Sequence, residues 1–158
     1  MKLDKYLAVG GAPGIHKLVA SRGNGIIIED RQEGRTRFVP TRGQQVTPLA
    51  TVAVYTFDAK EGEGTLPLVE VFQKMLDAVE TIPPVSPNAQ SQELRDYFSA
   101  VLPEHDRDRV HINDIKKCLK WFLFMREKGI FEEAIREAEA EAEKAKAETA
   151  PETKEETN

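Results

Sequence analysis

The sequence predicts an α+β protein: a small SH3-like, five-stranded β-barrel followed by a three-helix region and an acidic tail. Short segments rich in β-forming residues alternate with turn signals over residues 1–58. The apolar residues take a helical period over residues 65–130. Residues 131–158 are rich in Glu, Ala and Lys, and we expect a charged tail that is partly helical and partly disordered.

The barrel is predicted from five short strands and the turns between them. Pro13-Gly14 is typical of a type II turn, and Asn24-Gly25 is typical of a two-residue hairpin turn. Both glycines are therefore expected to have positive φ, and Gly34 is expected to occupy the left-handed position of a longer loop. The strands are expected at residues 5–9, 16–21, 26–30, 35–40 and 51–57.

The glycine-rich stretch Val9–Ala20 does not match a phosphate-binding loop. Counted from Gly11, the positions that should hold Gly, Lys and Ser or Thr hold His16, Lys17 and Leu18. Only the lysine fits, and no helical pattern follows. The stretch is expected to turn the chain.

Three helices are predicted, at about residues 66–80, 92–102 and 113–128. Apolar residues share one face of the first two, and the Pro-rich segment 82–88 separates them. Pro103 ends the second helix, Asn113 is the expected N-cap of the third, and Gly129 is its expected left-handed terminator. The sequence leaves open whether the barrel and the helices pack as one unit.

The charge, the cysteine count and the length of the apolar runs indicate where the protein resides and what it does not bind. The net charge is −5, with a weakly basic N-terminal part and an acidic tail. There is one cysteine, Cys118, so no intrachain disulfide is possible, and no apolar run is long enough for a membrane span. We expect a cytoplasmic protein with no membrane association and no evident small-molecule ligand.

No catalytic or metal-binding pattern is found, and we expect neither an enzyme nor a cofactor. His16, His105 and His111 lack the spacing of metal ligands, and the acidic loop 103–114 lacks the oxygen, Gly and Glu positions of a calcium loop. Cys118 lies on the apolar side of its predicted helix and is expected to pack as a small apolar residue.

One candidate nucleic-acid surface lies near a predicted hairpin. Small barrels bind RNA through cations and stacking aromatic rings. Acidic residues in the same hairpin cancel much of the charge, so an ordinary solvated strand is the competing interpretation. The candidate residues are Arg31, Arg35, Arg37, Phe38 and Arg42.

A candidate partner surface lies on the third predicted helix. This helix is apolar over about 260° of its circumference, whereas one buried stripe needs little more than about 100°. Trp121 and Phe124 are therefore candidates for a surface that meets another chain, with Lys117 and Lys120 at its rim. The alternative is a helix enclosed within the monomer.

Four sequence blocks carry a family resemblance: GAPGIHKLVA, LPLVEVFQKM, LRDYFSAVLPEHDRDRV and INDIKKCLKWF. In their order and spacing the chain resembles an uncharacterised family of Bacteroidota, a domain of unknown function. The resemblance covers most of residues 3–130. It implies a β N-terminal part and a helical C-terminal part, and it brings no catalytic residues.

Two functional hypotheses follow. The first is a non-enzymatic binding or adaptor protein that recognises another protein or forms a homodimer. The alternative is an RNA- or ribosome-associated factor that uses the Arg-bearing hairpin. The salt dependence of binding separates the two, because phosphate contacts weaken steeply as salt rises.

Overall fold

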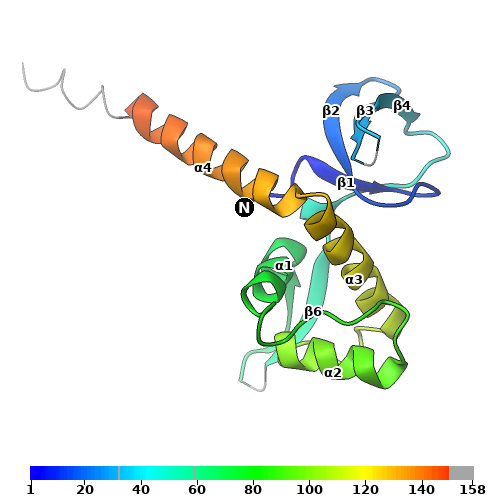
Figure 1. The fold of residues 1–158 in the computed structure, drawn as a ribbon, viewed down its shortest axis with the longest axis vertical. Coiled ribbons are helices and arrows are strands. Elements are labelled where there is room, and N and C mark those ends of the chain that lie inside the picture. The colour runs from blue at the N-terminus through cyan, green and yellow to red at the C-terminus, as the bar shows by residue number, and fades with distance from the viewer. Residues whose placement is uncertain (32, 59, 150–158) are drawn as a thin grey trace, which may run out of the picture.

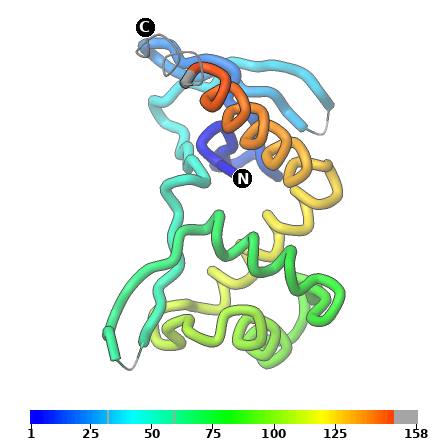
Figure 2. Tube along the Cα trace, turned by 90° about the vertical axis from the view of Figure 1, so that its left-hand side faces the viewer, coloured from blue at the N-terminus to red at the C-terminus, as the bar shows by residue number. Residues whose placement is uncertain are grey.

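The computed structural model describes residues 1–31, 33–58 and 60–149. Within these residues the chain has an α+β fold with a five-stranded sheet, a separate β-hairpin and four α-helices. The sheet lies at one end of the molecule, and the hairpin lies at the other end with the first two helices (Figures 1 and 2).

The five-stranded sheet is antiparallel and open. Its strand order is β4-β3-β2-β1-β5, so β4 and β5 are separate edges among the described residues, and the predicted closed barrel is wrong. The strands are β1 (Tyr6–Val9), β2 (His16–Arg22), β3 (Gly25–Asp30), β4 (Thr36–Pro40) and β5 (Val46–Pro48).

The last strand of the sheet also differs from the predicted one. Residues 46–48 pair with β1, with Val9 opposite Val46, whereas the strand predicted at 51–57 lies outside this sheet. Pro48 has no N–H to extend the ladder, and the 3₁₀ turn Leu49–Thr51 follows it directly. The chain therefore leaves the sheet before it can close a barrel.

The two turn glycines behave differently. Gly14 has φ +82°, as predicted. Gly25 lacks a positive φ, because it is the first residue of β3 and pairs with Arg22. Its small size is what matters: a Cβ there would lie 2.4 Å from the carbonyl oxygen of Val39 and 2.5 Å from the ring of Phe38.

A separate hairpin follows the sheet. It consists of β6 (Ala53–Asp58) and β7 (Gly62–Pro67), so the first predicted helix begins only after Pro67. The outer edge of β6 is tied to residues 104–106, because the N–H of Phe57 donates to the Glu104 carbonyl at 2.7 Å and the N–H of Asp106 donates to the Tyr55 carbonyl at 2.9 Å. The hairpin thus belongs with the helices.

Three helices lie close to the ranges that the apolar period predicts: α1 (Leu68–Asp77), α2 (Ser91–Val101) and α3 (Ile112–Glu127). The N-cap of α3 is His111 and not Asn113, and the backbone N–H of His111 donates to Asp114 Oδ2 at 2.9 Å. The buried faces of the helices form one core with Leu3, Tyr6, Ile15, Leu49 and Val54. The two parts of the chain therefore pack as one unit.

The C-terminal region contains a fourth helix, α4 (Ile130–Thr149), so the prediction of three helices is wrong, although the tail was expected to be partly helical. Gly129 has φ +70° and turns the chain after α3, which brings Ile130, Phe131 and Ala134 into the core. The Phe131 ring lies 5.5 Å from that of Phe72. The far half of α4 is exposed and points away from the body (Figure 1).

The end of the tail, residues 150–158, lies outside the described residues, so the disorder expected in part of the tail is not tested there. None of the helices in the described part of the chain has the length and apolar character that crossing a membrane would require.

Candidate functional site

A groove runs between the N-terminal sheet and α3 and continues along β6. It consists of two adjoining hollows of about 240 Å³ and 290 Å³. The smaller one is bounded by β1 and the turn after it, and the larger one by β6, α2 and α3. Four side chains line both hollows and so form the middle of the groove: Gln45, Thr47, Lys117 and Trp121.

The larger hollow has an apolar floor. Val54, Phe98, Val110 and Cys118 line it, and each is less than a tenth exposed. Burial raises the pKa of the Cys118 thiol to about 12, so this cysteine stays protonated at neutral pH and packs as an apolar side chain. The floor can accept an apolar side chain and offers no activated nucleophile.

The charged groups of the groove differ in how far they are engaged. Arg109 lies 2.8 Å from a Glu63 oxygen and 3.9 Å from an Asp106 oxygen. Asp114 accepts the N–H of His111 at the start of α3. Lys117 lies over the Trp121 ring, 5.9 Å from its centroid, and makes no ion pair with any described residue.

The predicted partner surface thus lies at this groove in part. Trp121 and Lys117 line it, and Lys120 is exposed one turn away on α3. Phe124 is half-buried against the chain itself, because its ring fills the space beside Gly14, where a Cβ would lie 2.5 Å from the ring. Phe124 therefore holds the β1–β2 turn against α3, next to Trp121.

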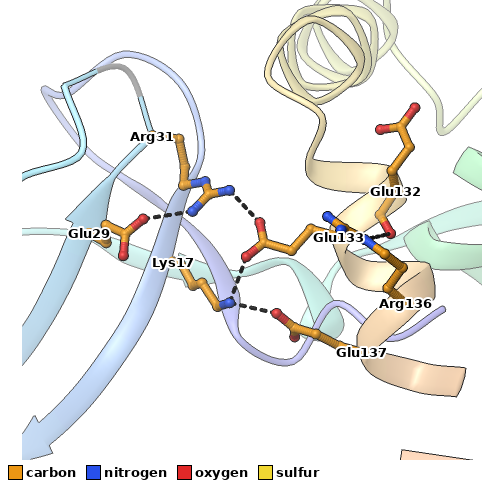
Figure 3. Close-up of polar contacts among 7 residues, drawn as sticks. All are labelled: Lys17, Glu29, Arg31, Glu132, Glu133, Arg136 and Glu137. Atoms are coloured by element: carbon orange, nitrogen blue, oxygen red, sulfur yellow. Dashed lines mark hydrogen bonds and ion pairs between the residues drawn. The ribbon is translucent and has the colours of Figure 1, made fainter. Parts of the chain in front are cut away.

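A second polar cluster joins α4 to the sheet (Figure 3). Lys17 of β2 donates to Glu133 at 2.8 Å and to Glu137 at 2.5 Å. Arg31 donates to Glu29 at 2.6 Å and also bonds Glu133. We call these five residues the clamp, because they connect the five-stranded sheet to α4.

The clamp shifts the pKa values of its own members. Burial alone would lower the pKa of Lys17, but its hydrogen bonds to Glu133 and Glu137 outweigh burial and raise it. Burial would raise the pKa of Glu133, but Lys17 and Arg31 outweigh it and lower it. Both groups are therefore charged at neutral pH, and the clamp is a structural contact.

The candidate nucleic-acid surface is divided by the clamp. Arg31 is engaged there and its side chain is only 19% exposed. Arg35, Arg37, Phe38 and Arg42 are exposed. Arg35 directly precedes β4 and Arg37 lies within it. This strand is an edge of the sheet, where charged side chains also protect a strand from pairing with other chains.

The histidines occupy structural positions. His16 and His105 are buried, and burial lowers the pKa of each. His105 Nδ1 donates to the Leu102 carbonyl at 2.7 Å. Over residues 1–31, 33–58 and 60–149, no group of three or more His, Cys, Asp or Glu lies close enough together to hold a metal ion.

The sequence reasoning missed the opposite wall of the groove. Gln45, Thr47 and residues 52–55 line it, although they carry no charge and match no motif. The alternation of side chains from Gln45, just before β5, to Thr47 within it is the signal that could have placed the two on one face, but a three-residue strand is too short for this alternation to be recognised.

Comparison with known proteins finds two family domains in the chain. Residues 3–49 match the domain of unknown function DUF5606, and residues 52–125 match DUF6852. A solution NMR structure of a Bacteroides vulgatus protein, a structural-genomics target, is 35% identical. Its TM-score is 0.62, and the match covers 82% of this chain and 89% of that chain. No curated protein matches. The resemblance predicted from the four sequence blocks is confirmed.

Proposed function

We propose that this chain, which belongs to the family of proteins with the domains of unknown function DUF5606 and DUF6852, is a non-enzymatic, protein-binding adaptor of the cytosol. The proposal rests on the residues of the chain itself. The binding site is the groove between the N-terminal sheet and α3. The observation that carries the proposal is the position of Trp121, which lies half-buried where the two hollows meet. Tryptophan is enriched among the residues that dominate binding energy at protein interfaces.

The shape and chemistry of the groove support binding over catalysis. Two hollows in a row suit an extended chain better than a compact substrate, and even the larger one is slightly below the roughly 300–1,000 Å³ typical of small-molecule pockets. Asp114 and Arg109 already serve structural contacts. The thiol of Cys118 stays protonated, which leaves the described groove without an activated nucleophile.

The cytosolic location is supported by cysteine usage. The chain has a single cysteine, and it is buried and free. Oxidising compartments favour paired cysteines in small proteins, whereas reducing compartments keep thiols free.

The alternative is an RNA- or ribosome-associated factor. Exposed Arg35, Arg37, Phe38 and Arg42 favour it, because cations beside an aromatic ring suit single-stranded RNA. The engagement of Arg31 in the clamp counts against it, since it removes one of the five candidate residues.

A photo-cross-linking experiment in living cells tests the proposal. A cross-linking amino acid replaces Thr47 in the groove, and a control version replaces Gln73 on the exposed face of α1. We expect a discrete protein adduct from position 47, absent from position 73 and lost when Trp121→Ala is added. An adduct removed by nuclease would support the RNA alternative, and no adduct at position 47 would overturn the proposal.

A further inference from the structure

The groove has an uneven charge balance at its middle. Arg109 is paired with the carboxylates of Glu63 and Asp106. Asp114 accepts the N–H of His111 in the first turn of α3, where the helix dipole favours a negative charge. Lys117 has no ion-pair partner among the described residues, and neither does the exposed Lys120 one turn later. These two lysines are therefore the cations beside the apolar floor that can meet an anionic group of a partner.

Resting on the proposed function, we propose that the partner segment is an extended, acidic peptide that places an apolar side chain in the larger hollow and a carboxylate on Lys117. The apolar side chain lies over Phe98, Val110 and Cys118, where each floor residue is buried. The carboxylate meets Lys117, whose Nζ is held over the Trp121 ring. An ion pair at this position favours one sign of charge in the partner.

The spacing along the groove favours an extended conformation. In an extended chain alternate side chains point to the same side, about 6–7 Å apart. An apolar residue in the larger hollow points its immediate neighbours away from the groove, so the side chain two residues along is the one that reaches Lys117 at the middle of the groove. Lys120 lies on the same face of α3, three residues further on. A peptide with an acidic residue two positions from an apolar residue matches this arrangement.

Single-stranded RNA is also an anion, but it fits this groove less well. Nucleic-acid channels follow the phosphate backbone with a stripe of cations. The middle of this groove offers Lys117 with the uncharged Gln45 and Thr47 opposite it. The two-lysine rim suits a few carboxylates and not a continuous phosphate backbone.

The fluorescence of Trp121 provides the test, because it is the only tryptophan in the chain and lies in the groove. The probes are a short peptide in which a glutamate stands two positions from a leucine, its twin with lysine at each glutamate position, and oligouridylate. We expect the acidic peptide to change Trp121 emission with at least tenfold higher affinity than the lysine twin. Lys117→Glu should weaken the acidic peptide at least tenfold, whereas Lys144→Glu, the same charge change on exposed α4, should stay within twofold.

Three results would overturn the inference: equal affinity for both peptides, tighter binding of the lysine twin or of oligouridylate, or no change in Trp121 emission with any peptide. None of these decides the proposed function, which depends on the adduct at position 47. A protein adduct without peptide selectivity would refute the acidic-peptide inference alone.

Discussion

Alanine substitutions at Gly11 and Gly14 can measure how much the packing of the β1–β2 turn against α3 contributes to stability. Both glycines have φ +82°, so alanine at either position meets the same backbone strain. Their surroundings differ: a Cβ at Gly11 has nothing within 4 Å, whereas a Cβ at Gly14 would lie 2.5 Å from the Phe124 ring. The difference between the two variants therefore isolates the packing of the β1–β2 turn on α3.

The expected magnitudes follow from strain and overpacking. Gly11→Ala should cost about 1–2 kcal/mol through the left-handed conformation alone. Gly14→Ala should cost about 2–5 kcal/mol, because forcing a methyl group into a packed site adds about 1–3 kcal/mol. Urea unfolding followed by far-UV circular dichroism measures both values.

A double mutant identifies the cause of the extra cost. Leucine at position 124 is smaller than phenylalanine, so in a Phe124→Leu background the cost of Gly14→Ala should fall toward that of Gly11→Ala. Trp121 emission should also shift in Gly14→Ala alone, since Gly14 and Trp121 line the same hollow. Equal costs at the two glycines, or a Gly14→Ala cost that the leucine does not change, would refute the reasoning.

Three further predictions concern stability. Glu133→Gln should lower the Tm by about 4–8 °C, because it removes a charge that two cations of the clamp share. The control Glu132→Gln, at the neighbouring exposed position, should lower the Tm by less than about 1 °C. Equal shifts would show that the clamp does not stabilise the fold. Burial lowers the pKa of His16, so below about pH 6.5 the unfolded chain binds more protons than the folded chain does. The free energy of unfolding should therefore decrease as the pH falls below about 6.5, by at most about 1.4 kcal/mol per pH unit. In melts from pH 7 to 5, His16→Leu should flatten this slope, and an unchanged slope would remove His16 as the cause. Deleting residues 141–158 should change the Tm by less than about 2 °C, because residues 141–148 are exposed, and a larger loss would mean that this segment packs on the body.

Local patterns in the sequence located most of the elements. Leu68, Val71, Phe72 and Met75 recur at helical spacing, and all four are buried on α1. Pro13-Gly14 specified its turn, and Gly34 and Gly129 have the positive φ expected of them. The breadth of the apolar surface on α3 also indicated that more than one side of this helix is in contact with other residues. Its buried residues lie in the core, Phe124 packs beside Gly14, and Trp121 lines the groove.

Two features depended on contacts between distant residues, which the sequence alone does not show. The first turn of α4 carries an apolar pair, Ile130 and Phe131, but only the packing of Phe131 on Phe72 and Phe122 makes this a core helix. Arg31 could not be separated from the other arginines of its hairpin by sequence, since its partner Glu133 lies more than one hundred residues later.

By itself, the sequence determined the α+β class, the approximate extent of α1, α2 and α3, and a lysine-flanked tryptophan as a candidate for binding. These features depend on local periodicity, backbone restriction and turn chemistry, which neighbouring residues specify. Only the tertiary structure decided that the sheet stays open, that α4 completes the core, and that Gln45 and Thr47 face Trp121 across a groove. The physical reason is that strand pairing and side-chain packing join residues far apart in the chain, and their geometry is set by the fold as a whole.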